Sequence, residues 1–389
     1  MLGTTMMGTP AVVIGLCAHG LGIVRDIARA GVPVIALEVD QTLPGTRSRW
    51  GRVSFVEDIN GDMLISALQD LASRLPGDCR PVLIPTNDRM VQVLGQHAAY
   101  LSNSYRLSWG DSAGRLLPLL DKSKIEERCN GVGLNYPRTR LLDDLSELHD
   151  TVRSLSFPVI VKPVRPLSSF KTIVVRSLRA LERERGRIEE CVPVLIQEFI
   201  EGGDDRIHFG ALYLDEGKVL ARFEGRKLYS RPMGHTTIAV PAPDDEVNAL
   251  TVCFFDGLDL SGPVSLEVKM GCDGRYWVIE PTVGRTDFWT GLCSANGVNF
   301  PLIEYAATLG LPLPLCQQKG ARTWLNGERH SMALAWLVLH RPRAVLSGFV
   351  GVYFDFGDMT PFLASTFGGA KSMLVRARQR IREAFRNGR

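Results

Sequence analysis

The amino-acid sequence predicts a mixed α/β and α+β protein, with an N-terminal doubly wound parallel α/β domain followed by a two-lobed domain with antiparallel sheets. Three observations carry this prediction. The chain of 389 residues is long enough for at least two compact units, and 45% of its residues are apolar. Short apolar runs alternate with helical patterns over the first hundred residues, which is typical of a parallel sheet with crossover helices. Beyond residue 200, strand patterns dominate.

The elements of the N-terminal domain are predicted from the period of its apolar residues. Consecutive apolar residues indicate buried strands, and apolar residues at helical spacing indicate the helices that connect them. Asn87 and Asp88 can cap the start of the third helix. The expected strands are residues 11–16, 33–39 and 81–85, and the expected helices are residues 21–30, 63–75 and 88–100.

The rest of the chain is predicted to contain charged helices and apolar strands. The expected helices are residues 121–128, 141–155 and 178–190. The expected strands are residues 157–163, 172–175, 192–199, 209–214, 219–223, 264–270 and 276–280. We therefore expect domains at residues 1–112, 113–318 and 319–389, with a lid subdomain at about residues 139–199.

Composition excludes several classes of protein. The 45 basic and 42 acidic residues give a net charge of +3, which is too balanced for a protein that binds nucleic acid. The eight cysteines are scattered without metal-ligand spacing, which is typical of reduced thiols in a cytoplasmic protein. The N-terminus has no signal-peptide pattern, and the apolar stretch 332–339 is too short to span a bilayer. We therefore expect a cytoplasmic location.

A dinucleotide site is one interpretation of the turn after the first strand. Glycines stand at positions 15, 20 and 22, and Glu38 and Asp40 end the second strand, where a ribose-binding carboxylate would lie. The dinucleotide fingerprint needs a third-position glycine, however, and that position is Cys17. The spacing favours a tight turn with closely packed glycines, and a dinucleotide-dependent oxidoreductase is the weaker alternative.

Two apolar strands end in residues suited to a nucleotide. Lys162 ends one strand before Pro163, and a lysine so placed is costly to bury unless it contacts an anion. The alternative is a lysine whose ammonium group reaches solvent at a sheet edge. Residues 194–205 run from a strand into a Gly-Gly turn and can present backbone groups to a flat heterocycle, with Asp204 placed for a ribose. A plain strand and turn is the alternative there.

A pair of carboxylates is predicted on one hairpin. Glu267 and Glu280 lie on two strands that the turn 271–274 joins. Carboxylates on paired strands repel unless a cation or proton separates them, and hard oxygen ligands suit Mg²⁺. Neighbouring apolar residues argue against the alternative of two solvent-facing glutamates. Arg226 and Lys227 add a second cationic position before the turn 234–237, and the alternative for them is a basic pair on the surface.

Taken in order, these features make residues 120–315 resemble the ATP-grasp superfamily, of the carboxylate–amine ligase type with an ATP-binding fold like that of the carbamoyl phosphate synthase large subunit. The preceding α/β domain is similar to the N-terminal domain of these enzymes. The matching motifs are Asp121-Lys122, the strand Phe157-Pro-Val-Ile-Val-Lys162-Pro163, the linker Gln197-Glu-Phe-Ile-Glu-Gly202, and Glu267 with Glu280. The resemblance implies an ADP-forming ligase that activates a carboxylate as an acyl phosphate with Mg-ATP and couples it to an amine.

The resemblance also implies roles for individual residues. It assigns ATP binding to Lys122, Lys162, Ser168, Ser169, Gln197, Glu198, Phe199, Ile200 and Asp204. It assigns the transferring phosphate to Lys227, the acceptor carboxylate or acyl phosphate to Arg285, and the metal (Mg²⁺, or Mn²⁺ in its place) to Glu267, Glu280 and Thr282. Two departures stand out. The family commonly has Asn at the position of Thr282, and its phosphate loop is often rich in glycine, whereas residues 164–170 contain none.

These departures keep open the alternative of a non-catalytic nucleotide-binding sensor. A bicarbonate-phosphorylating enzyme similar to carbamoyl phosphate synthase is a separate alternative. We expect small-molecule carboxylate and amine substrates, no nucleic-acid partner, and a homodimer. Residues 369–389 carry seven basic residues and one acidic residue on an expected amphipathic helix. That helix suits either a solvated position on the domain or weak contact with an anionic membrane surface.

Overall fold

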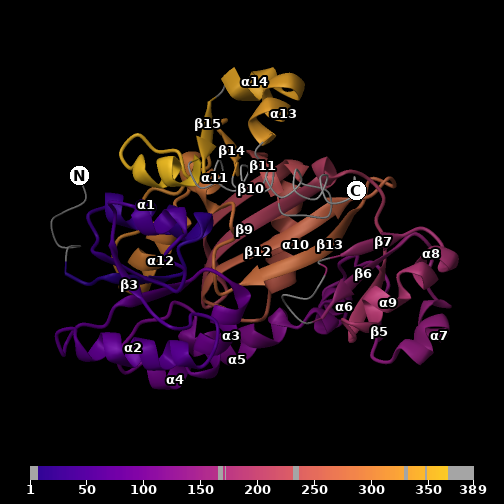
Figure 1. The fold of residues 1–389 in the computed structure, drawn as a ribbon, viewed down its shortest axis with the longest axis horizontal. Coiled ribbons are helices and arrows are strands. Elements are labelled where there is room, and N and C mark those ends of the chain that lie inside the picture. The colour runs from indigo at the N-terminus through magenta and orange to yellow at the C-terminus, as the bar shows by residue number, and fades with distance from the viewer. Residues whose placement is uncertain are drawn as a thin grey trace, which may run out of the picture.

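The computed structural model describes residues 8–164, 170, 172–230, 236–327, 332–346 and 348–366. Three β-sheets organise these residues (Figure 1). A parallel four-stranded sheet lies at one end, a small antiparallel four-stranded sheet lies at the other, and a seven-stranded sheet lies between them. This arrangement confirms the predicted fold class. The expected basic helix of residues 369–389 lies outside the described residues.

The N-terminal sheet has the strand order β3-β2-β1-β4, and all of its strands are parallel. Its strands are β1 (Ala11–Ile14), β2 (Val34–Glu38), β3 (Arg52–Phe55) and β4 (Val82–Pro85), and its helices are α1 (Ala18–Arg29), α2 (Met63–Ser73), α3 (Asp88–Gln96) and α4 (Ala98–Leu101). Asn87 caps α3 as predicted, because its side chain accepts a hydrogen bond from the Met90 N–H. The edge strand β3 was not predicted, since polar residues interrupt its apolar pattern.

The small sheet has the strand order β5-β8-β6-β7 and its own hydrophobic core. Its strands are β5 (Thr139–Leu142), β6 (Val159–Pro163), β7 (Ile173–Val175) and β8 (Val194–Glu198), and its helices are α7 (Leu148–Val152), α8 (Leu178–Arg183) and α9 (Arg185–Glu189). Figure 1 shows these helices on the outer side of the sheet, away from the seven-stranded sheet. The inner side of the small sheet is therefore free to face the rest of the molecule.

The predicted single helix over residues 141–155 is wrong. Thr139–Leu142 form β5, which pairs with β8, and only Leu148–Val152 form an α-helix. Asp144 caps the short turn between them by accepting a hydrogen bond from the Ser146 N–H. The charged side chains of this segment suggested a helix, but the partner strand that pairs with it lies some fifty residues further along the chain.

The seven-stranded sheet has the order β13-β12-β9-β10-β11-β14-β15 and is antiparallel except between β14 and β15. Its strands are β9 (Ile207–Asp215), β10 (Lys218–Ser230), β11 (Thr236–Pro241), β12 (Gly262–Met270), β13 (Tyr276–Val283), β14 (Thr323–Leu325) and β15 (Phe349–Gly351). The associated helices are α5 (Ala113–Leu116), α6 (Ile125–Gly131), α10 (Asp245–Phe255), α11 (Thr290–Ala295), α12 (Phe300–Thr308), α13 (Ala333–His340) and α14 (Pro342–Leu346). This sheet supplies most of the central core.

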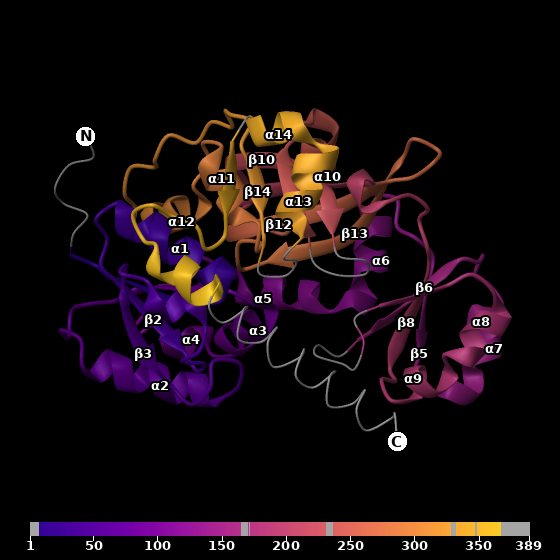
Figure 2. The ribbon, with the colours of Figure 1, turned by 45° about the horizontal axis from the view of Figure 1, so that its top comes forward.

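The late part of the chain returns to the N-terminal unit, where Figures 1 and 2 both show residues 348–366 beside α1. A buried ion pair fastens it there, since Arg25 Nε lies 2.9 Å from a carboxylate oxygen of Asp358. The same carboxylate accepts hydrogen bonds from the Ser48 hydroxyl at 2.6 Å and the Arg49 N–H at 2.9 Å. A buried pair satisfied in this way holds together segments that are more than 300 residues apart.

Two further expectations can be compared with the structure. All eight cysteines are free, as predicted. Within the described ranges, no helix combines the length and apolar character needed to cross a membrane.

A buried carboxylic acid lies where α12 packs between the N-terminal unit and β9. The Glu304 side chain is fully buried, and one of its oxygens accepts a hydrogen bond from the Ser108 hydroxyl at 2.7 Å. Burial raises the pKa of Glu304 from 4.5 to about 8, so the group is neutral at pH 7. The folded protein thus binds a proton here that the unfolded chain releases near pH 4.5.

We predict that Glu304→Gln makes the stability of the protein less dependent on pH. Between about pH 4.5 and 8 the folded state holds more protons than the unfolded state at this position, so the free energy of unfolding falls as the pH rises. The amide cannot ionise and keeps the contact with Ser108. Between pH 5 and 8, the melting temperature of the variant should rise relative to that of the wild type as the pH rises. A constant difference across this range would contradict the prediction.

Candidate functional site

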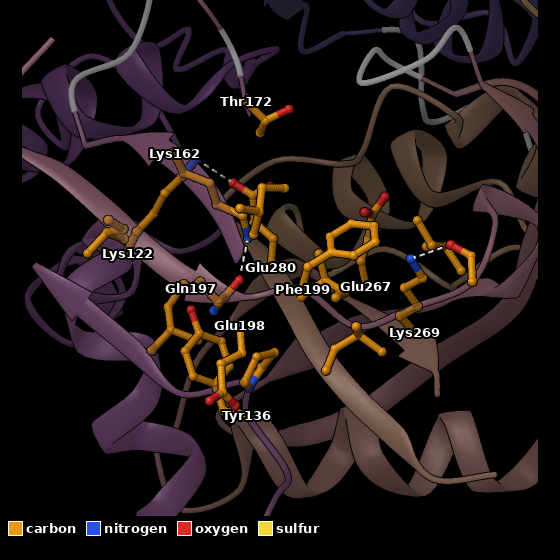
Figure 3. Close-up of a pocket in the computed structure, with 18 of the residues that line it drawn as sticks. Lys122, Tyr136, Lys162, Thr172, Gln197, Glu198, Phe199, Glu267, Lys269 and Glu280 are labelled. Carbon is orange, nitrogen blue, oxygen red and sulfur yellow. Dashed lines mark hydrogen bonds and ion pairs between the residues drawn. The ribbon is translucent and has the colours of Figure 1, made fainter. Parts of the chain in front are cut away.

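A cleft of about 210 Å³ lies between the inner side of the small sheet and the strands β10, β12 and β13 of the central sheet. Most residues that the sequence assigned to nucleotide and metal binding line this cleft (Figure 3). They are Lys122, Lys162, Gln197, Glu198, Phe199, Ile200, Asp204, Lys227, Glu267 and Glu280. Ser168, Ser169 and the turn at residues 234–235 lie in parts of the chain that are not described.

On the side of the small sheet, a row of hydrogen-bonded polar side chains crosses β6, β8 and β5 and forms the floor of the cleft. The Lys162 ammonium donates a hydrogen bond to the side-chain oxygen of Gln197 at 2.8 Å. The Gln197 amide in turn donates to the Thr139 hydroxyl at 2.8 Å. Antiparallel pairing of β8 with both neighbouring strands brings these residues together. Tyr136 lies beside them, and burial raises the pKa of its phenol to about 12, so it is a neutral donor.

The linker after β8 is held by its own hydrogen bonds. The N–H groups of Glu198 and Phe199 donate to the carbonyls of Arg138 and Pro158 at 3.0 and 2.9 Å. The Glu198 carboxylate accepts a hydrogen bond from the Ser156 N–H at 2.9 Å. These two backbone donors are therefore already used, and a heterocycle would have to bind other backbone groups of the linker.

Sequence reasoning missed Lys269, which fixes the far end of this linker. The residue is 5% exposed, and its ammonium donates to the Gly202 carbonyl at 2.8 Å and lies 4.6 Å from the centre of the Phe199 ring. Burial lowers its pKa, and the charge of Asp204 opposes that shift. Lys269 stands two residues after Glu267 on the same strand, so the two-residue period of a strand could have placed it in the cleft.

The two glutamates form the other wall, and each is paired with a lysine. Glu267 and Glu280 are direct cross-strand partners on β12 and β13, as the predicted hairpin requires. Lys227 on β10 lies 2.7 Å from a Glu267 oxygen, and Lys122 lies 3.1 Å from a Glu280 oxygen. The charge of Glu280 raises the pKa of Lys122. Two like charges placed side by side are thus neutralised by two cations from other elements.

Thr282 and Arg285 do not line the cleft in this structure. The Thr282 hydroxyl donates to the carboxylate of Asp287 at 3.2 Å, and burial raises the pKa of Asp287 to about 6. Arg285 Nε donates to Asp88 at 2.6 Å and so ties β13 to the start of α3. Nearby, His19 contacts the Thr286 hydroxyl at 2.9 Å, and burial lowers its pKa to about 3. Arg285 therefore lies where the N-terminal unit meets the central sheet, whereas Thr282 is held by Asp287, whose carboxylate is also affected by the charges of Glu267 and Lys227.

The donor set of the cleft fits a divalent cation only together with an anionic ligand. Among the described residues, no group of three or more His, Cys, Asp or Glu side chains has the arrangement of a metal site. Glu267 and Glu280 offer hard oxygen ligands from two neighbouring strands. Mg²⁺ is commonly bound by one or two carboxylates together with substrate phosphates, so this pair is sufficient for a metal that arrives with a nucleotide.

The turn after β1, where a dinucleotide would bind, is filled by side-chain and backbone groups of the protein itself. One oxygen of Glu38 accepts a hydrogen bond from the Leu16 N–H at 2.6 Å, and the other accepts from the Val39 N–H at 2.8 Å. Gly20 packs against the backbone of Gly15 so closely that an added Cβ would lie 1.9 Å from its carbonyl oxygen. The glycines thus form the tight turn that the sequence favoured, and the Glu38 carboxylate is already engaged by backbone N–H groups.

No family model matches the chain. Among curated proteins it is 23% identical to the carbamoyl phosphate synthase large chain of Methanoregula boonei over 247 residues, 59% of this chain and 23% of that one. The homologous large chain of Corynebacterium glutamicum is also 23% identical, over 59% of this chain and 22% of its own length. The chain therefore spans about a quarter of the length of the curated relatives that it matches.

Solved structures resemble the chain over most of its length. N5-carboxyaminoimidazole synthetase from Staphylococcus aureus, complexed with ADP, has a TM-score of 0.67 at 15% identity and covers 87% of this chain and 88% of its own. The synthase from Aspergillus clavatus, in complex with ADP and 5-aminoimidazole ribonucleotide, has a TM-score of 0.64 at 14% identity and covers 81% of each chain. Together with the motifs and the cleft, these likenesses show that the chain has the fold of the ATP-grasp carboxylate–amine ligases.

Proposed function

We propose that the protein is an ADP-forming ligase that activates a small-molecule carboxylate as an acyl phosphate with Mg-ATP and couples it to an amine. One observation carries the proposal. Lysines and glutamates from β6, β10, β12, β13 and the segment before α6 converge on a single cleft, although they are far apart in the sequence. Relatives with this fold bind ADP, which supports a nucleotide as the ligand.

The charges of the cleft suit this chemistry. A carboxylate that attacks the γ-phosphate of ATP brings two anions together, and the barrier falls when cations hold both groups in line. We assign the phosphates to Lys122, Lys162 and Lys227. Magnesium, held by Glu267 and Glu280, would supply further positive charge at the phosphate oxygens. The two lysine–glutamate pairs would then exchange partners, since each lysine gains a phosphate and each glutamate gains the metal.

The remaining assignments follow the geometry of the cleft. Gln197, Phe199 and Ile200 would line the base, and Asp204 would bind the ribose. Arg285 would reach the acceptor only through a change in its contact with Asp88. Thr282 would serve as the proposed metal ligand only if its hydroxyl left the carboxylate of Asp287. Ser168 and Ser169 remain assigned to the phosphates by resemblance alone.

A second candidate is phosphorylation of bicarbonate, favoured by the likeness to carbamoyl phosphate synthase large chains. A non-catalytic nucleotide sensor is a third, favoured by the engagement of Thr282 with Asp287. ADP release, screened with pools of carboxylates, amines and bicarbonate, separates the three.

We further propose a cytoplasmic location and a homodimer.

We predict that Lys162→Met and Glu280→Gln each abolish ATP turnover without unfolding the protein. Both side chains are assigned to phosphate or metal and keep their approximate size in the variants, so packing losses should be small. ADP formation and melting temperature are the measurements. Lys218→Met, an exposed lysine on the same central sheet, is the matched control and should keep full turnover. Full activity in either cleft variant would show that the residue assignments are wrong.

We predict that Lys227→Met strengthens the binding of Mn²⁺ to the protein without nucleotide. The variant frees the carboxylate of Glu267, which the lysine contacts at 2.7 Å. The affinity should rise by at least about fivefold, the lower end of typical coupling between two sites. Titration of free Mn²⁺ followed by electron paramagnetic resonance measures this directly, with Lys218→Met as control. An unchanged affinity would exclude competition between this lysine and the metal.

We predict that Lys269→Met weakens nucleotide binding while sparing the chemical step. The variant keeps an apolar stem but loses the charged hydrogen bond to Gly202 and the contact with Phe199. The loss of such a charged contact corresponds to roughly tenfold weaker binding. A fluorescent ATP analogue reports the affinity, and the KM for ATP should rise with little change in kcat. A fall in kcat with unchanged affinity would contradict this role.

A further inference from the structure

Helix α13 is apolar on all sides up to its last residue, yet the part of the chain that the structure describes covers it on only one side. Residues 333–339 contain no polar side chain. Ala333 and Leu337 pack into a core with residues of β10, β11 and β14, whereas Leu334, Val338 and Leu339 are exposed, the last at 76%. A helix that is apolar all round is normally buried all round. The outer side of α13 is therefore suited to a partner.

Helix α14 extends the same exposed surface. Ala344 and Val345 pack against the core that holds the inner side of α13, so the opposite side of α14 points away from it. Leu346 on that opposite side is 87% exposed. Figures 1 and 2 both show the two helices together at the periphery of the molecule. We name this surface the α13–α14 face, and its exposed apolar side chains are Met332, Leu334, Val338, Leu339 and Leu346.

The charged residues within this part of the chain are all arginines. Arg341 and Arg343 are exposed and follow directly on α13. Residues 330–354 contain no Asp or Glu. The α13–α14 face therefore combines exposed aliphatic side chains with arginines that are attracted to negative charge.

This charge distribution distinguishes between the candidates that could cover the face. A second copy of the chain would bring the same surface to the other side of a twofold axis, with no Asp or Glu from residues 330–354 to pair with the arginines. Residues 369–389 carry seven basic residues and one acidic residue, so their charge opposes binding there too. An anionic lipid surface accepts aliphatic side chains at its acyl boundary and attracts arginines to its headgroups.

We propose that the α13–α14 face docks on an anionic membrane surface. Leu339 and Leu346 enter the boundary between headgroups and acyl chains, and Arg341 and Arg343 bind the lipid phosphates. The helices lie on the bilayer and do not cross it, in keeping with their lengths of eight and five residues. This inference is independent of the ligase assignment, because no residue of the face lines the cleft.

The test is sedimentation of the full-length chain with vesicles of phosphatidylcholine alone and of phosphatidylcholine with phosphatidylglycerol. The wild type should bind the anionic vesicles and not the neutral ones. Leu339→Gln with Leu346→Gln should weaken binding by more than about tenfold, because each leucine loses its burial in the bilayer. Arg341→Gln with Arg343→Gln should weaken it by roughly fivefold per arginine. ATP binding should be unchanged in both variants.

Leu315→Gln is the matched control, since this leucine is 85% exposed on the segment between α12 and β14. It should bind vesicles as the wild type does. Three results would overturn the proposal. The wild type could fail to bind anionic vesicles, the leucine variant could bind them as well as the wild type, or light scattering could show a dimer that the leucine variant dissociates. The second result would assign binding to residues 369–389, and the third would assign the face to a second copy.

Discussion

The cross-strand pairing of Glu267 with Glu280 is the constraint on which the cleft depends. Two carboxylates directly opposite each other on β12 and β13 repel, and in a partly buried site water screens this repulsion only in part. Lys227 from β10 pairs with Glu267, and Lys122 from the segment before α6 pairs with Glu280, so each negative charge has a cation beside it. The cleft is thus nearly neutral by itself, and it can accept a metal and an anion together more easily than either alone.

Elsewhere in the described residues, charged groups that are buried are also paired with an opposite charge or with hydrogen-bond donors. Arg25 and Asp358 form a pair that fastens the late chain to α1, and Glu38 is held by backbone N–H groups at the turn after β1. Glu304 instead keeps its proton, since its hydrogen-bonding partner Ser108 carries no charge. The contacts of Arg25 and Glu304 join the N-terminal unit to later parts of the chain through polar groups that would be costly to bury unpaired.

The elements that the sequence predicted well are those whose pattern is local. The buried strands β1 and β4 are continuous apolar runs, and Asn87 begins its helix with a side-chain cap. The errors fall where long-range pairing overrides local pattern. Residues 139–142 form a strand because β8 is beside them, and β3 forms at the sheet edge although only one side of its ladder is paired.

The sequence by itself determined the order of the motifs and the hairpin of the two glutamates, and it predicted nucleotide binding by the lysines, because each depends on residues close together in the chain. Only the tertiary structure decided which lysine meets which glutamate, that Lys269 closes the linker, and that Thr282 and Arg285 turn towards Asp287 and Asp88. Most of these contacts join residues that are far apart in the sequence. Their geometry depends on how the sheets pack, which no local pattern of residues encodes.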